Sequence, residues 1–159
     1  MKDHKALLGE ELLYPSHKDF ILDHYPLYNL NRASATYIEK MALELKKYSM
    51  DQPSWRVLML LDDKNPSSVG EISRRSVTKI STITRILMRM EKEQLVKRVP
   101  FIDDKRVIEV FILKKGQDML VKLRKLADGV FQNAMAGLSD DEIISFTNIL
   151  KKVRKNLSE

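Results

Sequence analysis

Residues 69–95 read VGEISRRSVTKISTITRILMRMEKEQL, two short stretches of helical apolar spacing separated by a polar break. Ser68 precedes them and is followed three residues later by Glu71, which is the spacing of a capping box at a helix start. This signal predicts a short helix over about 69–75, and a turn through Ser76 and Val77 leads into a second helix over about 79–93. Two helices joined by so tight a turn form a helix-turn-helix.

The second predicted helix has two opposed faces. At about 100° per residue, an expected core stripe lies within about 80° and contains Ile80, Ile83, Leu87 and Met90. The opposite face carries hydroxyl and basic side chains without an acidic one: Thr78, Ser81, Thr82, Arg85, Arg89 and Lys92. A solvated helix face more commonly mixes Glu with Lys. This face therefore favours a helix in the major groove of DNA, where hydroxyls and arginine forks reach base edges or phosphates.

Residues 98–113, RVPFIDDKRVIEVFIL, look like two apolar runs folded about a charged tip. Strands are expected around 95–101 and 107–113, with Lys105 and Arg106 carried outward to the phosphate backbone or minor groove. Asp104 is expected to hold Arg106 through an ion pair. A plain surface hairpin would explain the strands but not a basic tip beside a basic helix, so the pattern indicates a winged helix.

The charge distribution agrees with this interpretation. The chain of 159 residues carries 28 Lys or Arg against 22 Asp or Glu, for a net charge of +6. Ten of the basic and five of the acidic residues lie between Glu71 and Arg106, so nearly all the excess is in one segment. Such a patch attracts polyanions.

Helices are also expected on both sides of this unit. Apolar residues recur at steps of three and four over about 27–48, and Asp51 is an N-cap signal for the next helix. A long helix is expected just after Gly116, and Ser139 with Glu142 is a capping box for the last one. These two helices carry continuous apolar stripes, Leu120, Leu123, Ala127, Val130 and Ala134 in one and Ile143, Phe146, Leu150, Val153 and Leu157 in the other. One small domain cannot easily cover both, which predicts pairing with a second copy; an internal three-helix pack is the alternative.

Several classes of function find no support. The chain has no cysteine, so disulfides and thiolate sites are excluded, and it lacks a Gly-rich phosphate loop and a nucleophile elbow. His17 and His24 have no acidic partner that would complete a zinc set. No signal peptide or membrane span is evident. We therefore expect no enzyme activity, cofactor, metal or membrane association, and a cytoplasmic location.

Four segments together resemble the multiple antibiotic resistance regulator (MarR) family of bacterial transcription factors over about residues 27–157. They are SWRVLMLL, VGEISRRSVTKISTITRILMRMEKEQLVKR, DDKRVIEVFILKKG and LSDDEIISFTNILKKV, and Asp104, Lys105 and Arg106 stand at the family's Asp-x-Arg wing signature. Gln94 departs from the family's usual helix-ending glycine, and Lys114 from a frequent threonine. The resemblance implies a roughly triangular homodimer that binds a pseudo-palindromic operator, usually represses a neighbouring gene, and is released by an aromatic acid or phenol.

The candidate sites follow from these patterns. The expected DNA contacts are Arg74, Arg75, Thr78, Lys79, Ser81, Thr82, Arg85, Arg89, Arg98, Lys105 and Arg106. Residues 16–37 are rich in groups suited to an aromatic carboxylate, and with the next helix they give the candidate ligand residues His17, Tyr25, Tyr28, Asn31, Arg32, Tyr37, Trp55 and Arg56. Arg32 is the expected anion partner. Core packing of the aromatics and an intersubunit ion pair of Arg32 remain alternatives.

The sequence thus predicts a mainly α fold with a small β-wing. Residues 1–48 would supply an N-terminal segment and a dimerisation and ligand-pocket helix, 49–114 the winged helix-turn-helix, and 115–159 the C-terminal dimerisation helices. The predicted function is a ligand-responsive transcriptional regulator, and the family resemblance implies that it is a repressor. The alternative is a winged-helix adapter that binds a protein or another nucleic acid without small-molecule control.

Overall fold

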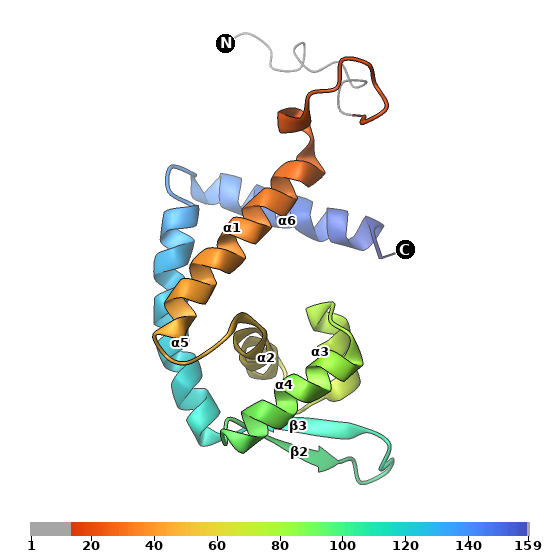
Figure 1. The fold of residues 1–159 in the computed structure, drawn as a ribbon, viewed down its shortest axis with the longest axis vertical. Helices are drawn as coiled ribbons and strands as arrows, with labels where there is room; N and C mark the ends of the chain where they lie inside the picture. The colour runs from red at the N-terminus through yellow and green to blue at the C-terminus, as the bar shows by residue number, and fades with distance from the viewer. Residues whose placement is uncertain (1–13, 159) are drawn as a thin grey trace.

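The computed structural model describes residues 14–158. A short 3-10 helix, η3 (Leu22–His24), precedes α1 (Pro26–Lys46) and α2 (Gln52–Asp63). The helix-turn-helix consists of α3 (Val69–Ser76) and α4 (Ile80–Lys92), and the wing of β2 (Val96–Pro100) and β3 (Ile108–Ile112). Two long helices follow, α5 (Lys114–Ala134) and α6 (Asp140–Asn156). Figure 1 shows α2, α3, α4 and the wing gathered at one end, with α1 and α5 extending away from them.

The expected fold class, mainly α with a small β-wing, is confirmed. The sheet has the order β1-β3-β2 and is antiparallel throughout, with Val96 opposite Ile112 and Pro100 opposite Ile108. Its third strand, β1 (Ser67–Ser68), pairs Ser67 with Val110 and was not predicted. A strand of two serines has no alternation of apolar and polar residues, so periodicity cannot reveal it.

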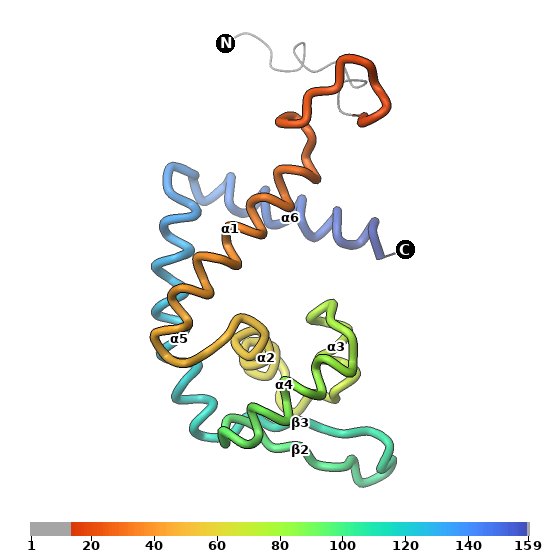
Figure 2. The backbone as a smooth tube through the Cα atoms, viewed as in Figure 1, coloured from red at the N-terminus to blue at the C-terminus, as the bar shows by residue number. Residues whose placement is uncertain are grey.

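One hydrophobic core joins the helix-turn-helix to the long helices. Leu58 and Leu61 of α2, Leu87 of α4 and Val110 of β3 are fully buried in it. The same core includes residues from the lower parts of the long helices, Met41 and Leu45 of α1 and Leu120 and Leu123 of α5. The tube in Figure 2 shows these two helices running past one another before they reach the core. The long helices and the helix-turn-helix are therefore packed in one continuous core.

Most helix starts match their sequence signals. Asp51 accepts a hydrogen bond from the Ser54 backbone N at 2.9 Å, and the Ser139–Glu142 capping box is complete. At α3 only half of the predicted box forms, because the Ser68 hydroxyl accepts from the Glu71 backbone N at 3.1 Å while the Glu71 carboxylate bonds to Lys64. Lys64 therefore binds the carboxylate that a complete capping box would direct to the Ser68 backbone N.

The core stripe of α4 differs from the prediction by one residue. Ile83, Leu87 and Met90 are buried as expected, but Ile80 is 57% exposed and Ile86 takes its place in the core. Ile80 begins the helix, where no further element covers it. α5 also begins earlier than the sequence predicts, because its first residue is Lys114 and Gly116 lies inside its first turn.

Gln94 forms the turn that ends α4 despite its departure from the family's glycine. Its φ is +62°, the left-handed region, and its backbone N donates to the Glu91 carbonyl at 2.9 Å. The Leu95 N donates to the Met90 carbonyl at 2.9 Å, which completes a Schellman motif with Leu95 and Met90 both buried. Packing of these two side chains imposes on glutamine a conformation that favours glycine.

We therefore expect Gln94→Gly to raise the free energy of unfolding by about 0.5–1 kcal/mol, because a left-handed L residue costs about 1–2 kcal/mol and glycine loses more entropy on folding. Urea denaturation measures the change. Gln94→Ala, which keeps the Cβ, is the matched control and should stay close to wild type. A destabilised glycine variant would contradict this account of the turn.

Candidate nucleic-acid interface

The turn between α3 and α4 is fixed by a local network of hydrogen bonds. The Ser73 hydroxyl donates to the Thr78 carbonyl at 2.6 Å, and the Thr78 hydroxyl donates to the Ser76 carbonyl at 3.0 Å. Arg56 Nη1 reaches the same Ser76 carbonyl from α2 at 3.3 Å. Val77, between them, has a φ of +51°. These bonds set the angle at which α4 leaves α3.

The exposed face of α4 keeps part of the predicted basic set. Lys79, Ser81 and Arg85 are exposed, and neither cation has an ion-pair partner among the described residues. Thr82 is half-buried, and Thr78 is half-buried with its hydroxyl engaged in the turn. Arg74, in the last turn of α3, is also exposed. Arg85 is thus the arginine that α4 presents most freely.

Arg89 forms an ion pair that the sequence did not predict. Its Nη2 donates to Asp51 Oδ2 at 2.5 Å and to the Ser54 hydroxyl at 2.8 Å, so it clamps α4 to the start of α2. Burial raises the pKa of the Asp51 carboxyl, but hydrogen bonds from Ser54 and the charge of Arg89 outweigh it and leave the pKa below its ordinary value. The helical wheel could not reveal this pair, because Asp51 is 38 residues away in sequence.

Two other predicted DNA contacts are also held by carboxylates. Arg98 Nε and Nη2 both bond to Glu91 Oε2, at 2.9 and 2.7 Å, and its backbone N bonds to Oε1 at 2.8 Å. Arg75 is paired with Asp63. Arg98 therefore ties the wing to α4, and Arg75 ties α3 to α2, while their DNA contacts stay predictions.

The Glu91–Arg98 pair predicts a pH dependence of stability. The backbone N–H of Arg98, followed by its side chain, lowers the pKa of Glu91 below the ordinary 4.5. A depressed folded pKa stabilises the fold above the unfolded pKa, and that stabilisation is lost as the pH falls through the folded value. We expect Glu91→Gln to lower the free energy of unfolding by up to about 1 kcal/mol at pH 7, and by progressively less as the pH falls below the ordinary Glu value of 4.5. Urea denaturation at pH 7 and at several pH values below 4.5 measures the free energy of unfolding, with Glu93→Gln as the control. A loss in Glu91→Gln that stays the same across these pH values would contradict the prediction.

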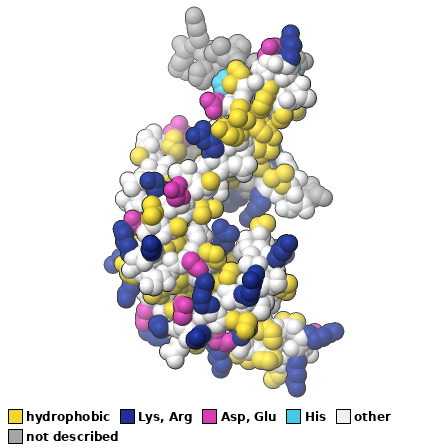
Figure 3. All heavy atoms as spheres, in the orientation of Figure 1, with side chains coloured by type: hydrophobic (Ala, Val, Ile, Leu, Met, Phe, Trp, Pro, Cys, Tyr) yellow, Lys and Arg dark blue, Asp and Glu magenta, His cyan; other side chains and the backbone are white. Residues whose placement is uncertain are grey.

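The tip of the wing has the expected ion pair. Arg106 Nε and Nη2 donate to the two carboxylate oxygens of Asp104, each at 2.9 Å, and the Arg106 backbone N donates to Oδ1 at 3.0 Å. These bonds from the Arg106 side chain and backbone lower the pKa of Asp104. The Arg106 side chain is nevertheless 91% exposed, and Lys105 beside it is exposed. Figure 3 shows Lys and Arg side chains over the lower part of the molecule, including its lower extremity.

The predicted ligand residues do not form one site. Trp55 is 5% exposed and belongs to the core, Arg56 bonds to the α3–α4 turn, and neither lines the pocket described next. Tyr25 packs edge-on against Phe20, with ring centroids 5.7 Å apart. His17, Tyr28 and Asn31 do not line the pocket described next, although the Arg32 guanidinium lies 5.5 Å from the Tyr28 ring centroid.

Arg32 and Tyr37 line a pocket of about 1010 Å³ between α1 and α5. The α1 side also supplies Asn29, Thr36 and Lys40, and the α5 side supplies Leu126, Val130 and Asn133. Sequence reasoning missed Lys40. The signal was present, since Arg32, Thr36 and Lys40 recur every four residues and therefore lie on one helix face.

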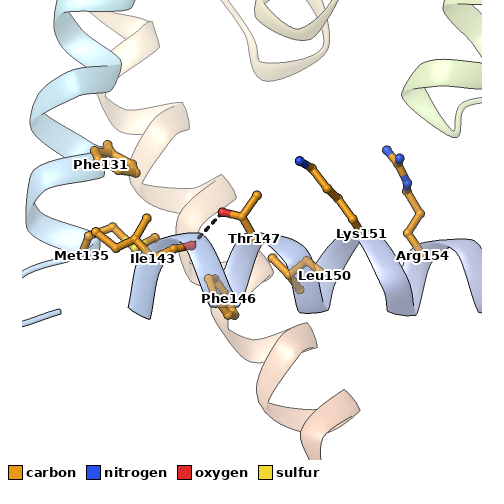
Figure 4. Close-up of a pocket in the computed structure, with 8 residues that line it drawn as sticks. All are labelled: Phe131, Met135, Ile143, Phe146, Thr147, Leu150, Lys151 and Arg154. Carbon is orange, nitrogen blue, oxygen red and sulfur yellow. Dashed lines mark hydrogen bonds between the residues drawn. The ribbon is translucent and has the colours of Figure 1, made fainter. Parts of the chain in front are cut away.

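A second hollow, of about 330 Å³, lies between α5 and α6. Figure 4 shows Phe131 of α5 and Met135 just after it with the apolar residues Ile143, Phe146 and Leu150 of α6, and shows Lys151 and Arg154 leaving α6 on one side. No described residue of α6 is buried, and Ile144 and Ile149 are largely exposed. The internal three-helix pack is thus not formed within one subunit.

Among the described residues, no helix is long and apolar enough to cross a membrane, and no cluster of three or more metal-ligating side chains occurs.

Comparison with known proteins agrees with this geometry. A model of the MarR family matches residues 50–108. The HTH-type transcriptional repressor IacR of Pseudomonas putida is 34% identical over 143 residues, which cover 90% of this chain and 86% of IacR. Among solved structures, mutant MarR from E. coli complexed with operator DNA has a TM-score of 0.73 and 22% identity, covering 80% of this chain and 93% of its own. Bordetella bronchiseptica BpsR, whose DNA binding is regulated by 6-hydroxynicotinic acid, has a TM-score of 0.72 and 17% identity, with coverages of 80% and 96%.

The family match covers α2, the helix-turn-helix, β2 and the tip of the wing, and the exposed basic residues of α3, α4 and the wing tip lie within it. The similarity to IacR extends the relation over nearly the whole chain, including the long helices. A regulator of this kind acts by binding rather than by catalysis, so the protein is not an enzyme. The chain belongs to the MarR family of winged helix-turn-helix transcriptional regulators.

Proposed function

We propose that the protein is a repressor that binds a pseudo-palindromic operator as a homodimer and releases it when a small aromatic carboxylate binds. The observation that carries this proposal is the exposed α4 face with Arg85, flanked by the Asp104-supported fork of Arg106 on the wing. IacR, which resembles the chain over most of its length, is a repressor.

In the proposed complex, α4 lies in the major groove. Ser81 and Arg85 approach base edges there, and Lys79 and Arg74 approach phosphates on the groove walls. The wing brings Lys105 and Arg106 to the adjacent backbone or minor groove. Because Asp104 holds Arg106 in one orientation, less side-chain entropy is lost on binding. Mutant MarR of E. coli, which shares the fold, forms a complex with operator DNA, and this supports operator binding by the chain.

The homodimer is supported by the apolar face of α6. Phe146, Ile149 and Leu157 are exposed on a helix with no described buried residue, and the hollow beside α5 is open to another chain. A stripe of this kind in water favours association. Two-fold symmetry then presents two α4 helices to DNA, and half-sites about one helical turn apart are expected.

The pocket between α1 and α5 is the proposed effector site. Arg32 and Lys40 supply two cations for a carboxylate, Tyr37 an aromatic face and Asn133 a neutral hydrogen-bond group. The regulation of BpsR by 6-hydroxynicotinic acid, itself an aromatic carboxylate, supports this ligand class.

The pocket is connected to the DNA-binding surface through α5. This helix begins two residues after the wing strand β3 ends, and its first half contributes Leu120 and Leu123 to the same core as α4. A ligand that binds better to one spacing of α1 and α5 therefore shifts the population towards one position of the wing. Release of DNA is the expected outcome when that position does not fit the operator.

The test is a fluorescence-anisotropy titration with a labelled duplex from the region upstream of the protein's own gene. Unlabelled unrelated duplex is the competitor, and benzoate, salicylate and 6-hydroxynicotinate are the effector probes. Binding that survives competitor, with two subunits per duplex, and is lost with one acid supports the proposal. Binding that competitor abolishes would contradict sequence-specific recognition and favour an adapter whose basic face binds another partner.

For the effector site, we expect Arg32→Ala to raise the acid concentration for half-release by about tenfold or more, since a charge-assisted hydrogen bond contributes about 1.5–3 kcal/mol. Operator affinity without the acid should not change. Lys46→Ala, on the same helix but outside the pocket lining, is the matched control. An unchanged half-release concentration in Arg32→Ala would exclude Arg32 as the anion partner.

A further inference from the structure

Two apolar side chains are exposed where α4 begins, ahead of the basic residues on its exposed face. Val77, in the α3–α4 turn, is 90% exposed, and Ile80, the first residue of α4, is 57% exposed. Lys79 lies between them in sequence, and Ser81 and Arg85 follow on the exposed side of α4. No part of the described chain covers this pair.

Val77 is exposed although its backbone conformation is unfavourable for valine. Its φ of +51° is in the left-handed region, which is least favourable for a β-branched residue and costs about 1–3 kcal/mol. Glycine or asparagine would adopt the same turn at lower cost. Since the valine side chain gains almost no burial in return within the subunit, packing inside the subunit does not account for it.

The position of the pair limits what it could contact. The N-terminal residues of a recognition helix are the ones that approach base edges in the major groove. Hydroxyl and basic side chains can bond to phosphates and to polar base atoms, but Val77 and Ile80 have no polar atom to offer. The C5 methyl of thymine is the apolar group that a base edge displays in this groove.

We propose that Val77 and Ile80 form an apolar subsite that reads a thymine methyl group in each operator half-site. The subsite rests on the proposed function, because it requires α4 to lie in the major groove. It adds a base preference that neither Arg85 nor the wing supplies, since arginine forks favour guanine and the wing reads the backbone or minor groove.

The test uses a duplex selected by the full-length protein from a library of random double-stranded DNA. Each thymine of one half-site is replaced in turn by uracil, which removes only the C5 methyl. With wild-type protein, we expect binding to fall about three- to fivefold at one or two positions, the effect of exposing roughly one buried methyl group. In Val77→Ala and Ile80→Ala, the loss of affinity that uracil causes at those positions, called the uracil penalty below, should shrink or disappear.

Two further variants separate recognition from structure. Val77→Asn relieves the left-handed valine, so it should raise the melting temperature while it removes the uracil penalty; a purely structural residue would not show this opposite movement. Met88→Ala, which truncates another exposed apolar residue further along α4, should keep the penalty at the positions that Val77 and Ile80 read.

The outcomes distinguish failure of the proposed operator binding from failure of the apolar subsite alone. If no sequence is enriched, the proposed operator binding fails and the subsite fails with it. If a sequence is enriched but no uracil weakens binding, or the valine and isoleucine variants keep the same penalties, the subsite alone is wrong. If the variants instead dissociate the dimer, the pair lies at a contact between subunits, and the proposal is overturned.

Discussion

Gly116→Ala is expected to lower the free energy of unfolding by more than about 3 kcal/mol, through overpacking in the core. A Cβ at this position would lie 2.2 Å from the Leu95 carbonyl oxygen and 3.0 Å from Ile112 Cγ1. The same carbonyl accepts a hydrogen bond from the Leu113 backbone N at 2.9 Å. The clash is therefore with backbone that is tied to the start of α5, and a side-chain rotation cannot relieve it.

Urea denaturation compares the variant with wild type, and Gly129→Ala is the matched control. Gly129 lies in the same helix, and a Cβ there meets no atom within 4 Å. Alanine at Gly129 should stabilise by up to about 1 kcal/mol, because glycine is the poorer helix former. If Gly116→Ala remained within about 0.5 kcal/mol of wild type, the close approach of α5 to the α4–β2 turn would not be required for folding.

The role of Gly116 could not be predicted from the local sequence. A glycine near a helix start is readily interpreted as a boundary, because glycine is unfavourable inside helices. In the fold, α5 crosses the turn after α4 so closely that only a residue without Cβ fits. Local propensity cannot report such a contact, because it depends on a segment some twenty residues earlier in the chain.

The elements themselves could be predicted from periodicity and capping. Asp51 and Ser139 cap the helices as expected, and the wing strands fall within the predicted ranges. These signals are local, involving residues three or four apart, and so they survive in a single sequence.

The functional surface was predicted less completely than the fold. The wheel placed Arg85 and Arg89 on one face, but Asp51 captures Arg89 from a different helix. Arg98 and Arg75 were likewise assigned by charge, without knowledge of which carboxylate would lie beside them. Ion pairs across elements depend on tertiary packing, whereas the apolar face of a helix is fixed by its own spacing.

Arg85 differs from Arg75, Arg89 and Arg98 because no described carboxylate forms an ion pair with it. We expect Arg85→Ala to weaken binding to the selected operator by about 1–3 kcal/mol, which is roughly five- to 150-fold, with little change on random DNA. The substitution removes a base contact that the operator provides and random sequences do not. Lys105→Ala should instead weaken both DNAs alike and reduce the slope of log K against log salt by about 1, because it removes one phosphate contact.

Arg89→Ala provides the comparison within the same helix. Its loss leaves Asp51 and Ser54 without their partner, so it should reduce stability by about 1 kcal/mol and change the operator-to-random ratio little. Anisotropy titrations on both duplexes at several salt concentrations, beside urea denaturation of each variant, separate the three effects. Equal losses on operator and random DNA for Arg85→Ala would make Arg85 a phosphate contact and leave base reading to Ser81 and the residues at the start of α4. A large change in the ratio for Arg89→Ala would mean that its ion pair opens on DNA, and that the arginine reads a base after leaving Asp51.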